Sequence, residues 1–522
     1  MKKTGNILNF RNKTAACIAA IFAFVAPWIF YSCRVGYVFI DSYTFSGLSM
    51  TLFFIMVFNA LVAAANAFLL LTGLERVPEG KKEKLPLIAK GVWISEIVVS
   101  ILTALFTVAW VVFFVVLGEE SSPLAGRMLA SVAPYMAITF CAVFFALFFP
   151  AVKNGKARLT VLCFCVVAGI IGLTSAIFPF GKFEFISDPA VIDTGDGYSV
   201  VFALSDTGTG YIEYEFGGKE YRIYNEDGGR KVNARIHSFT VPYEAAASGY
   251  KVGATRVTDE LTYGGRVGKS IESGEYEIKP IKGEEQKYLC VSDWHTELKK
   301  AKKATGYISG YDGIILLGDA AAGLQYEEEA AEYVVGFAGD LSKGSVPIIY
   351  ARGNHETRGA YASELRDALN LKEFYTDIKV GNYRFIVLDS AEDKEDGHAE
   401  YGQMADYSAY RERMVEFLEG LNAEEGEKIV VICHDYKICR EEELSERALA
   451  KLGNLGATVI LCGHYHEVGF GEIGGIPYFI DGGKTDEGFI VSEVRIRESG
   501  ITMTAIDEDG KTVDSYKIDE WK

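Results

Sequence analysis

Basic residues, cysteine and histidine are all scarce in this chain of 522 residues, and each shortage excludes something. Lysine and arginine number 52 against 70 aspartates and glutamates, a formal net charge of -18. Because phosphate backbones bind to basic surfaces, we expect no nucleic-acid partner. The nine cysteines form no disulfide pattern, since five fall in hydrophobic stretches of the first third. Buried thiols are expected for the others, with a Cys433 to Cys439 bridge as the alternative.

Charged residues are nearly absent from five long stretches in the first third of the chain. Each is apolar on all sides and has about the 20 residues that a helix needs to cross a bilayer, which excludes buried helices of a soluble domain. The predicted spans lie near residues 15–33, 47–73, 92–117, 128–151 and 159–179. Residues 1–181 are therefore predicted to form a transmembrane helical region in contact with the lipid bilayer.

The loops between these spans differ in their content of lysine and arginine. Basic residues gather before the first span, between the second and third, and between the fourth and fifth. Since loops of this kind stay in the cytoplasm, we expect a cytoplasmic N-terminus. Five spans then place the chain after residue 181 outside the cytoplasm. The predicted protein is an integral protein of the cell membrane.

Residues 182–283 alternate polar and apolar positions over about seven short runs separated by Gly-Gly turns. This pattern is typical of a β-sandwich. The stretch contains no cysteine, so a disulfide-pinned immunoglobulin domain is excluded and a fibronectin-III-like β-sandwich is predicted. His237 stands alone in one of these runs and is interpreted as structural.

From residue 284 to 522 the pattern changes to compact apolar runs such as GIILL and KIVVIC, mostly separated by helical stretches. Strands that are apolar on both faces, with helices between them, predict a covered α/β sheet. Sites in such sheets lie at the carboxyl ends of the strands. The last segment returns to alternation and predicts antiparallel strands.

Polar residues of one chemical kind follow these apolar runs, and five of the seven histidines are among them. They are Asp293 and His295 after YLCV, Asp319 after GIILL, Asn354 and His355 after VPIIY, His434 after KIVVIC, and His464 and His466 after TVILC. Imidazole and carboxylate ligands suit Mn, Fe, Zn or Co, and the lack of grouped cysteines excludes a structural zinc or iron–sulfur site. Because residues i and i+2 of a strand point alike, Asp293 with His295, and His464 with His466, are expected to face one centre.

The order Asp-x-His, Gly-Asp, Gly-Asn-His-Glu, a strand-terminal His and Gly-His-x-His resembles the calcineurin-like metallophosphoesterase superfamily over residues 286–522. The resemblance implies an α/β four-layer metallophosphoesterase domain with two divalent metal ions, and hydrolysis of a phosphate ester by a metal-bound hydroxide. It also implies a role for each strand-end residue. Asp293, His295 and His466 would bind the first ion, Asn354, His434 and His464 the second, Asp319 would bridge them, and His355 would serve the leaving group.

Several other polar residues lie close to these motifs in the sequence. Arg352 and Arg358 bracket the Asn-His pair and suit phosphate binding, with ordinary surface ion pairs as the alternative. Glu356 or Asp435 is predicted to orient a neighbouring imidazole or to be simply structural. Two more residues are not expected to be ligands: His398, in an acidic loop, and Asp389, at a strand end.

The order of domains is similar to that of purple acid phosphatases, but two motifs depart from that family. The family has Asp-x-Gly in its first motif, where this chain has Asp293-Trp294-His295. The family also places a tyrosine ligand three residues after the bridging aspartate, where this chain has Ala322. The coloured ferric site of purple acid phosphatases is therefore not expected.

Three functions are consistent with the sequence. The leading hypothesis is a membrane-anchored, extracytoplasmic phosphoesterase. The alternative is a membrane sensor or transport component whose outer domain binds a phosphorylated ligand. Within the spans, Glu96 is the ionisable candidate for such a role. Asn59 and Asn66 are polar but uncharged, and helix packing is the alternative role for these residues. A third hypothesis keeps the enzyme and lets the spans present a lipid-linked substrate.

Overall fold

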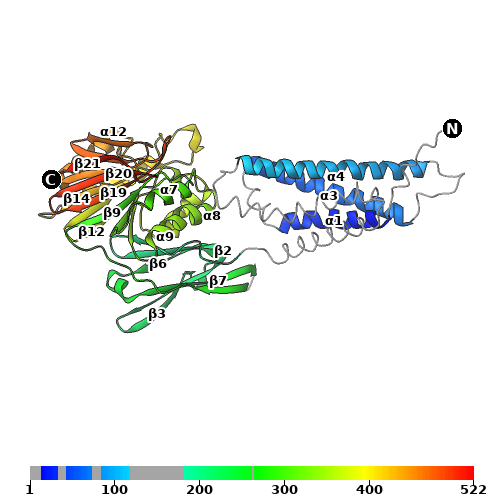
Figure 1. Cartoon of the computed structure of the whole chain (residues 1–522), viewed down its shortest axis with the longest axis horizontal. Helices are drawn as coiled ribbons and strands as arrows, with labels where there is room; N and C mark the ends of the chain where they lie inside the picture. The colour runs from blue at the N-terminus through cyan, green and yellow to red at the C-terminus, as the bar shows by residue number, and fades with distance from the viewer. Residues whose placement is uncertain (1–12, 33–42, 73–83, 118–181, 262–263) are drawn as a thin grey trace. The chain divides into compact units, whose positions relative to one another are not determined.

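The computed structural model describes residues 13–32, 43–72, 84–117, 182–261 and 264–522. The chain divides into two compact units, residues 1–181 and residues 182–522. Figure 1 draws the first as helices and the second as β-sheets with helices against them. The division falls where the long apolar stretches of the sequence end.

The described part of the first unit consists of three long helices, α1 (Lys13–Ser32), α3 (Tyr43–Thr72) and α4 (Lys84–Leu117). They overlap the first three predicted spans. By length and composition, one segment among the described residues, Phe53–Thr72, is sufficient to cross a membrane. The predicted spans at 128–151 and 159–179 lie outside the described residues. The five-span bundle and its topology therefore stay predictions.

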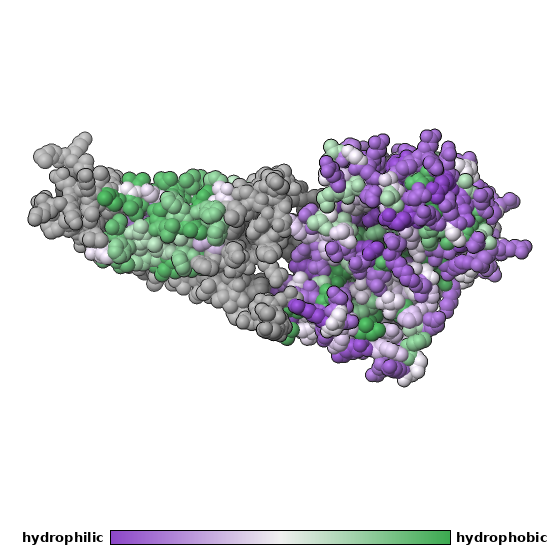
Figure 2. All heavy atoms as spheres, turned by 180° about the vertical axis from the view of Figure 1, so that it is seen from behind, coloured by the Kyte–Doolittle hydropathy of each residue, from purple (hydrophilic) through white to green (hydrophobic). Residues whose placement is uncertain are grey.

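These three helices expose large apolar side chains and pack through small ones. Phe58 and Leu61, in the middle of α3, are 54% and 64% exposed. Figure 2 shows hydrophobic residues over the outside of the described helices, and mostly hydrophilic residues over the second unit. Between α1 and α3, Ala23 packs against Ala60 and Ala63. Small residues of this kind allow two helix backbones to approach closely.

Polar side chains in this unit are buried between α3 and α4. Asn66 donates a hydrogen bond to Glu96, and Ser100 donates one to Asn59 over 3.0 Å. All four side chains are at most 4% exposed. The helices thus pair their few polar groups with one another and leave their outer faces apolar.

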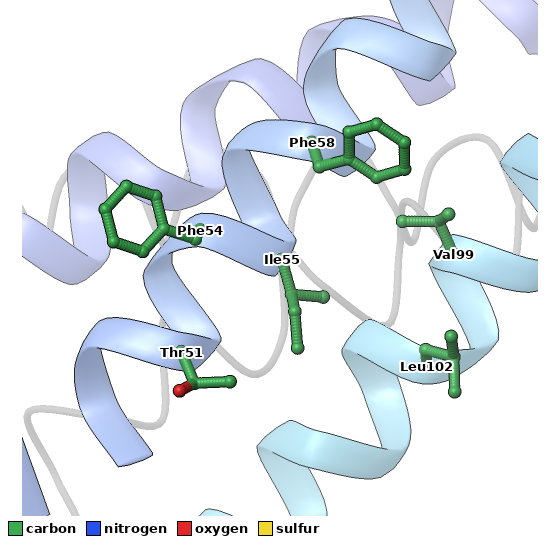
Figure 3. Close-up of a pocket in the computed structure, with 6 residues that line it drawn as sticks. All are labelled: Thr51, Phe54, Ile55, Phe58, Val99 and Leu102. Atoms are coloured by element: carbon green, nitrogen blue, oxygen red, sulfur yellow. The ribbon is translucent and has the colours of Figure 1, made fainter. Parts of the chain in front are cut away.

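An open apolar groove of about 440 Å³ also lies between α3 and α4 (Figure 3). It is lined by Thr51, Phe54, Ile55, Phe58, Val99 and Leu102. None of these side chains is charged or able to bind a metal, so the groove has no part in the strand-end chemistry.

The second unit is built on two mixed β-sheets. Three parallel strands form the centre of the larger sheet: β9 (Gln286–Val291), β10 (Gly313–Leu316) and β11 (Pro347–Tyr350). Three antiparallel strands form one edge of this sheet: β19 (Gly488–Arg497), β20 (Gly500–Asp507) and β21 (Thr512–Ile518). The six-stranded sheet has the order β12 (Thr376–Val380), β13 (Tyr383–Val387), β14 (Lys428–Ile432), β15 (Ala457–Cys462), β17 (Ile476–Asp481) and β16 (Val468–Ile473). Strands β13, β14, β15 and β17 of this sheet are parallel.

Four layers result because both faces of the central strands are buried. On β9, Tyr288 and Cys290 face the second sheet, whereas Leu289 and Val291 face the helices. The helices against the larger sheet are α7 (Leu298–Thr305), the π-helix η5 (Ala330–Gly336) and α9 (Phe337–Ser342); those against the smaller sheet are α11 (Tyr407–Gly420) and α12 (Glu442–Leu455). This double burial explains why the strands appear in the sequence as continuous apolar runs.

Residues 182–283 differ from the separate sandwich that the sequence predicts. Strand β1 (Ala190–Asp193) pairs in parallel with β11, and β2 (Tyr198–Phe216) pairs with β1, so these strands extend the larger sheet. The strands β3 (Lys219–Tyr224), β6 (Ala234–Val241), β7 (Tyr250–Leu261) and β8 (Gly264–Glu272) continue it. The physical reason is the free edge of β11, whose backbone groups β1 satisfies. The predicted boundary at residue 283 therefore falls inside one compact unit, and a fibronectin-III arrangement is not shown.

The remaining predictions for this unit concern single residues. His237, on β6, is fully buried. Its Nε2 lies 3.1 Å from the carbonyl oxygen of Gly208, and its Nδ1 lies 3.3 Å from the side-chain nitrogen of Asn225. Cys433 and Cys439 are both buried free thiols. The bridge between them is therefore absent from this structure.

Candidate metal centre

The strand-end residues come from both sheets and meet at one place. In the larger sheet, Asp293 and His295 follow β9, Asp319 follows β10, and Asn354 and His355 follow β11. In the smaller sheet, His434 follows β14, and His464 and His466 follow β15. Because the strands within each sheet run parallel, their carboxyl ends lie at one edge. The face-to-face packing of the sheets then brings the two edges together.

Asp293, His295 and His466 form one group of metal-binding side chains whose ligand atoms lie within 4.8 Å of one another. Oδ1 of Asp293 lies 3.9 Å from Nε2 of His295 and 3.8 Å from Nε2 of His466. The two imidazole rings are stacked, with centroids 5.0 Å apart. Asp293 is fully buried, whereas His466 is exposed, so the group opens toward solvent on one side.

Asp319, His434 and His464 form a second group of this kind. Oδ2 of Asp319 is 3.3 Å from Nε2 of His434 and 3.6 Å from Nε2 of His295 in the first group. The side-chain amide of Asn354 lies 3.1 Å from Nε2 of His434 and 3.2 Å from Nδ1 of His464, and its hydrogen bonds are best satisfied with the amide nitrogen on this side. Asp319 therefore lies between the two groups, the position that a bridging carboxylate requires.

The backbone at these residues is not extended, which corrects our reason for their convergence. Asp293, His295, Asp319, His464 and His466 all have positive φ, between 34° and 74°. They lie beyond the strand ends, so the alternation of a strand does not orient their side chains. Left-handed backbone at non-glycine residues costs free energy and is concentrated at functional sites. Tight turns, rather than the spacing i and i+2, bring the side chains together.

Backbone carbonyls fix the orientation of three of the histidine rings. Nδ1 of His434 donates to the carbonyl of Leu317 over 2.6 Å, and Nδ1 of His466 donates to that of Lys484 over 2.6 Å. A carbonyl can only accept, so Nδ1 carries a proton in both rings, and Nε2 is the nitrogen that could bind a metal after losing any proton of its own. His355 is held in the same way, 3.0 Å from the carbonyl of Ala322.

Glu356 and Asp435 hold neighbours other than the imidazoles that we expected. Glu356 is fully buried and accepts hydrogen bonds from the backbone amides of Asp319, Ala320 and Gly353. It thereby ties the loop after β10 to the loop after β11. Asp435 accepts from the hydroxyl of Tyr465 over 2.8 Å and pairs with Arg440, while His464 is 4.0 Å away. Both carboxylates fix loops that carry ligands.

The two arginines beside the Asn-His pair have different surroundings. Arg352 is buried, pairs with Asp389 over 2.7 Å and lies over the ring of Phe374. It is thus engaged in the core and is not available to a substrate. Arg358 is partly exposed, and its Nη1 lies 3.1 Å from Nε2 of His355. His398, by contrast, is exposed and makes only a local bond, accepting from the amide of Glu400.

Charges at the centre shift the pKa values of its members. Burial alone would lower the pKa of His434, but the adjacent Asp319 raises it to about 10. Burial would raise the pKa of Asp319, but the neighbouring histidines, His434 first, lower it. Burial lowers the pKa of His295 to about 4. Asp319 is therefore an anion that attracts positive charge, and His295 is neutral, as a metal ligand must be.

One buried oxygen indicates that a cation fits this centre. Oδ1 of Asp293 is buried without a hydrogen-bond partner, which is costly for a carboxylate. A divalent ion would satisfy this oxygen together with the imidazole nitrogens around it.

Comparison with known proteins agrees with this chemistry. The family model of calcineurin-like phosphoesterases matches residues 286–468. Residues 286–468 belong to the calcineurin-like phosphoesterase family. The phosphoesterase segment includes every predicted metal ligand, so the chain is a metal-dependent phosphoric ester hydrolase. No curated protein matches the chain by sequence.

Several solved structures are distantly similar to this chain. They include GAP50 of Plasmodium, described as an anchor in the inner membrane complex (14% identity, 46% of this chain and 90% of that chain covered, TM-score 0.33). A predicted phosphoesterase from Streptococcus pneumoniae has 14% identity, with 45% of this chain and 98% of that chain covered and a TM-score of 0.24. A phosphopantetheinyl hydrolase from Mycobacterium tuberculosis has 15% identity, with 39% and 92% covered and a TM-score of 0.27. These similarities are too weak to bear on substrate.

One residue at the centre was not predicted from the sequence. Glu392, in the loop after β13, accepts from Nε of Arg358 over 2.6 Å and from the hydroxyl of Thr357 over 3.0 Å. It lies 34 residues beyond Arg358 in an acidic loop, AEDKEDG, where no spacing distinguishes it from its neighbours. Only the folded chain places it beside the ligands.

Proposed function

We propose that this chain is a membrane-anchored phosphoesterase with two divalent metal ions that hydrolyses phosphate monoesters or diesters outside the cytoplasm. The observation that carries the proposal is Asp319, a buried carboxylate between two groups of imidazole ligands. A single ion would leave one of these groups without a cation. Neither a purple-acid-phosphatase-like order of domains nor a fibronectin-like sandwich supports the proposal.

The ligand set determines which residues would hold the ions. Asp293, His295 and His466 would bind one, and Asn354, His434 and His464 the other, with Asp319 shared. When bound, such ions supply Lewis acidity toward the phosphate oxygens and lower the pKa of water to near neutrality. Mn, Fe, Zn and Co all suit these donors.

His355 is proposed to serve the leaving oxygen. Its Nδ1 is held by the carbonyl of Ala322, so Nε2 is the atom that can hold or deliver a proton toward the centre. Nε2 is 3.9 Å from Oδ2 of Asp319, and the ring lies edge-on to His295 with centroids 4.7 Å apart. Arg358, whose Nη1 contacts the same ring nitrogen, supplies a positive charge to the phosphate oxygens.

Membrane anchoring is proposed from the first unit. Its described helices present apolar side chains outward and pair their polar ones inward, the arrangement that lipid favours. The basic loops of the sequence support a cytoplasmic N-terminus and an external phosphoesterase segment. A reporter fused to the C-terminus tests this topology, and its detection in the cytoplasm would contradict it.

Turnover by the full-length protein in detergent tests the activity. With added Mn, Fe, Zn or Co, we expect metal-dependent hydrolysis of nitrophenyl phosphate or bis-nitrophenyl phosphate. Asp319→Asn should abolish it, and His355→Ala should lower kcat with little change in bound metal. His398→Ala is the matched histidine control and should behave as the wild type. If none of the four metals supports turnover of either ester, the proposal is wrong.

A further inference from the structure

The guanidinium of Arg358 binds the buried carboxylate of Glu392 through two of its nitrogens, and its third nitrogen faces the metal centre. Its Nε and Nη2 donate to the two carboxylate oxygens of Glu392 over 2.6 and 3.0 Å. Its Nη1 lies 3.1 Å from Nε2 of His355. Because a guanidinium is planar and rigid, fixing two nitrogens in this fork fixes the direction of the third.

Glu392 is itself held in place. Its side chain is completely buried, and it also accepts from the hydroxyl of Thr357 over 3.0 Å. Arg411, buried on α11, donates to the backbone carbonyls of Ser390 and Glu392 over 3.3 Å each. Both the backbone and the carboxylate of Glu392 are therefore constrained before Arg358 binds to it.

The strength of this pair follows from its burial. A buried carboxylate without a partner is costly, so Glu392 stabilises a single placement of Arg358. Burial alone would raise the pKa of Glu392, but the bonds from Arg358 and Thr357 bring it to about 2. The next residue, Asp393, is half-buried and lies 3.8 Å from the same guanidinium, so it contributes far less.

We infer that Glu392 is a positioning residue that holds Nη1 of Arg358 beside His355, where this nitrogen donates to an oxygen of the phosphoryl group at the metal centre. The inference rests on the proposed function for the identity of the ligand. It makes the loop after β13 part of the phosphate site, although that loop supplies no metal ligand. It also predicts that binding of any phosphoryl group, inorganic phosphate included, depends on Glu392.

Binding of inorganic phosphate to the metal-loaded, full-length protein tests the inference without requiring turnover. We expect Glu392→Gln, which keeps shape and removes charge, to raise the dissociation constant of phosphate about tenfold. Arg358→Ala should have an equal or somewhat larger effect, and the double variant should be no weaker than Arg358→Ala alone. Asp393→Asn is the matched control and should stay within about twofold of the wild type.

Several readouts separate positioning from simple support of the fold. Metal content and the thermal midpoint of each variant should stay close to wild type, and KM for nitrophenyl phosphate should rise more than kcat falls. Arg358→Lys, which keeps the charge but not the fork, should resemble Glu392→Gln. Unchanged phosphate binding in Glu392→Gln, additive effects in the double variant, or loss of metal together with phosphate would each overturn the inference. Absence of turnover in the wild type would refute the proposed function. The phosphate dissociation constants would still decide whether Glu392 positions Arg358.

Discussion

The described parts of the two compact units expose opposite kinds of side chain. In the described helices of residues 1–181, Leu61 and Phe58 are exposed while Asn66 and Glu96 are buried against each other. In residues 182–522, large apolar side chains fill four core clusters on the two sheets. Polar groups are buried there both inside strands, as at His237, and beyond the strand ends, as at Asp319.

This difference shows that the solvent around a unit determines whether burial of apolar or of polar side chains stabilises it. In water, burial of apolar surface drives folding, so a buried carboxylate needs a specific reason. In lipid, the environment that we propose for the first unit, exposed apolar surface costs no free energy, and polar groups must find partners inside the bundle. A buried polar group thus fits helix packing in the first unit, whereas in the second unit it has either hydrogen-bond partners, as His237 has, or a place at the metal centre, as Asp319 has. Substitutions at matched positions can break this comparison.

The largest effect is expected at the metal centre. His434→Ala removes a proposed, buried ligand and leaves Oδ2 of Asp319 without its nearest imidazole neighbour. We expect turnover to fall by about 10³-fold or more, since even residues that only support a ligand cost 10- to 100-fold. His398→Ala, an exposed histidine in the acidic loop, should change nothing. Metal analysis beside the rate measurement checks the cause: full metal content with unchanged turnover in His434→Ala would contradict the ligand assignment.

The next effect concerns the exposed faces. Leu61→Lys places a charge in the middle of α3, where a lipid environment makes it unfavourable by about 3 kcal/mol. We expect a clear loss of membrane-inserted protein in carbonate extraction. Val513→Lys is the matched change in the second unit, where Val513 is 49% exposed on β21, and it should be neutral. If Leu61→Lys reduced membrane-inserted protein no more than Val513→Lys does, the helices would not be surrounded by lipid.

The fold and the site were predictable to different extents. Apolar runs located the central strands, because both faces of β9 and β10 are buried. The proposed ligands could be named from the sequence because polar residues follow the apolar strand runs directly. The extension of the sheet by β1 was not predictable, since pairing with β11 joins residues more than 150 positions apart. Glu392 was missed for the same reason: its significance depends on a partner that only tertiary structure brings near.

A smaller effect is expected from a polar group buried in the second unit without a charged partner. Burial lowers the pKa of His237 from 6.5 to about 4, so the folded state holds the neutral ring. The stability that this contributes is complete above pH 6.5 and is lost as the pH falls toward 4. Between pH 7 and pH 5 the loss is about 2 kcal/mol. Urea unfolding at both pH values measures it. His237→Gln should reduce the difference by that amount, and an unchanged difference would show that the ring is not held neutral.

The smallest effect is expected where the helical unit buries its polar pair. Asn66→Leu removes the amide that donates to Glu96, and a bond of this kind between membrane helices contributes about 1 kcal/mol. Denaturation of the full-length protein in mixed detergent micelles, followed by the signal of the helices, should show a loss of that size. Ala65→Leu, on the exposed side of α3, is the control and should have no effect. If Asn66→Leu left stability unchanged, packing would no longer explain why this carboxylate is buried. Glu96 would then become a candidate ligand-binding group, and the sensor or transport hypothesis would gain over simple anchoring, because a buried ionisable group in a membrane that is not needed for packing needs a function.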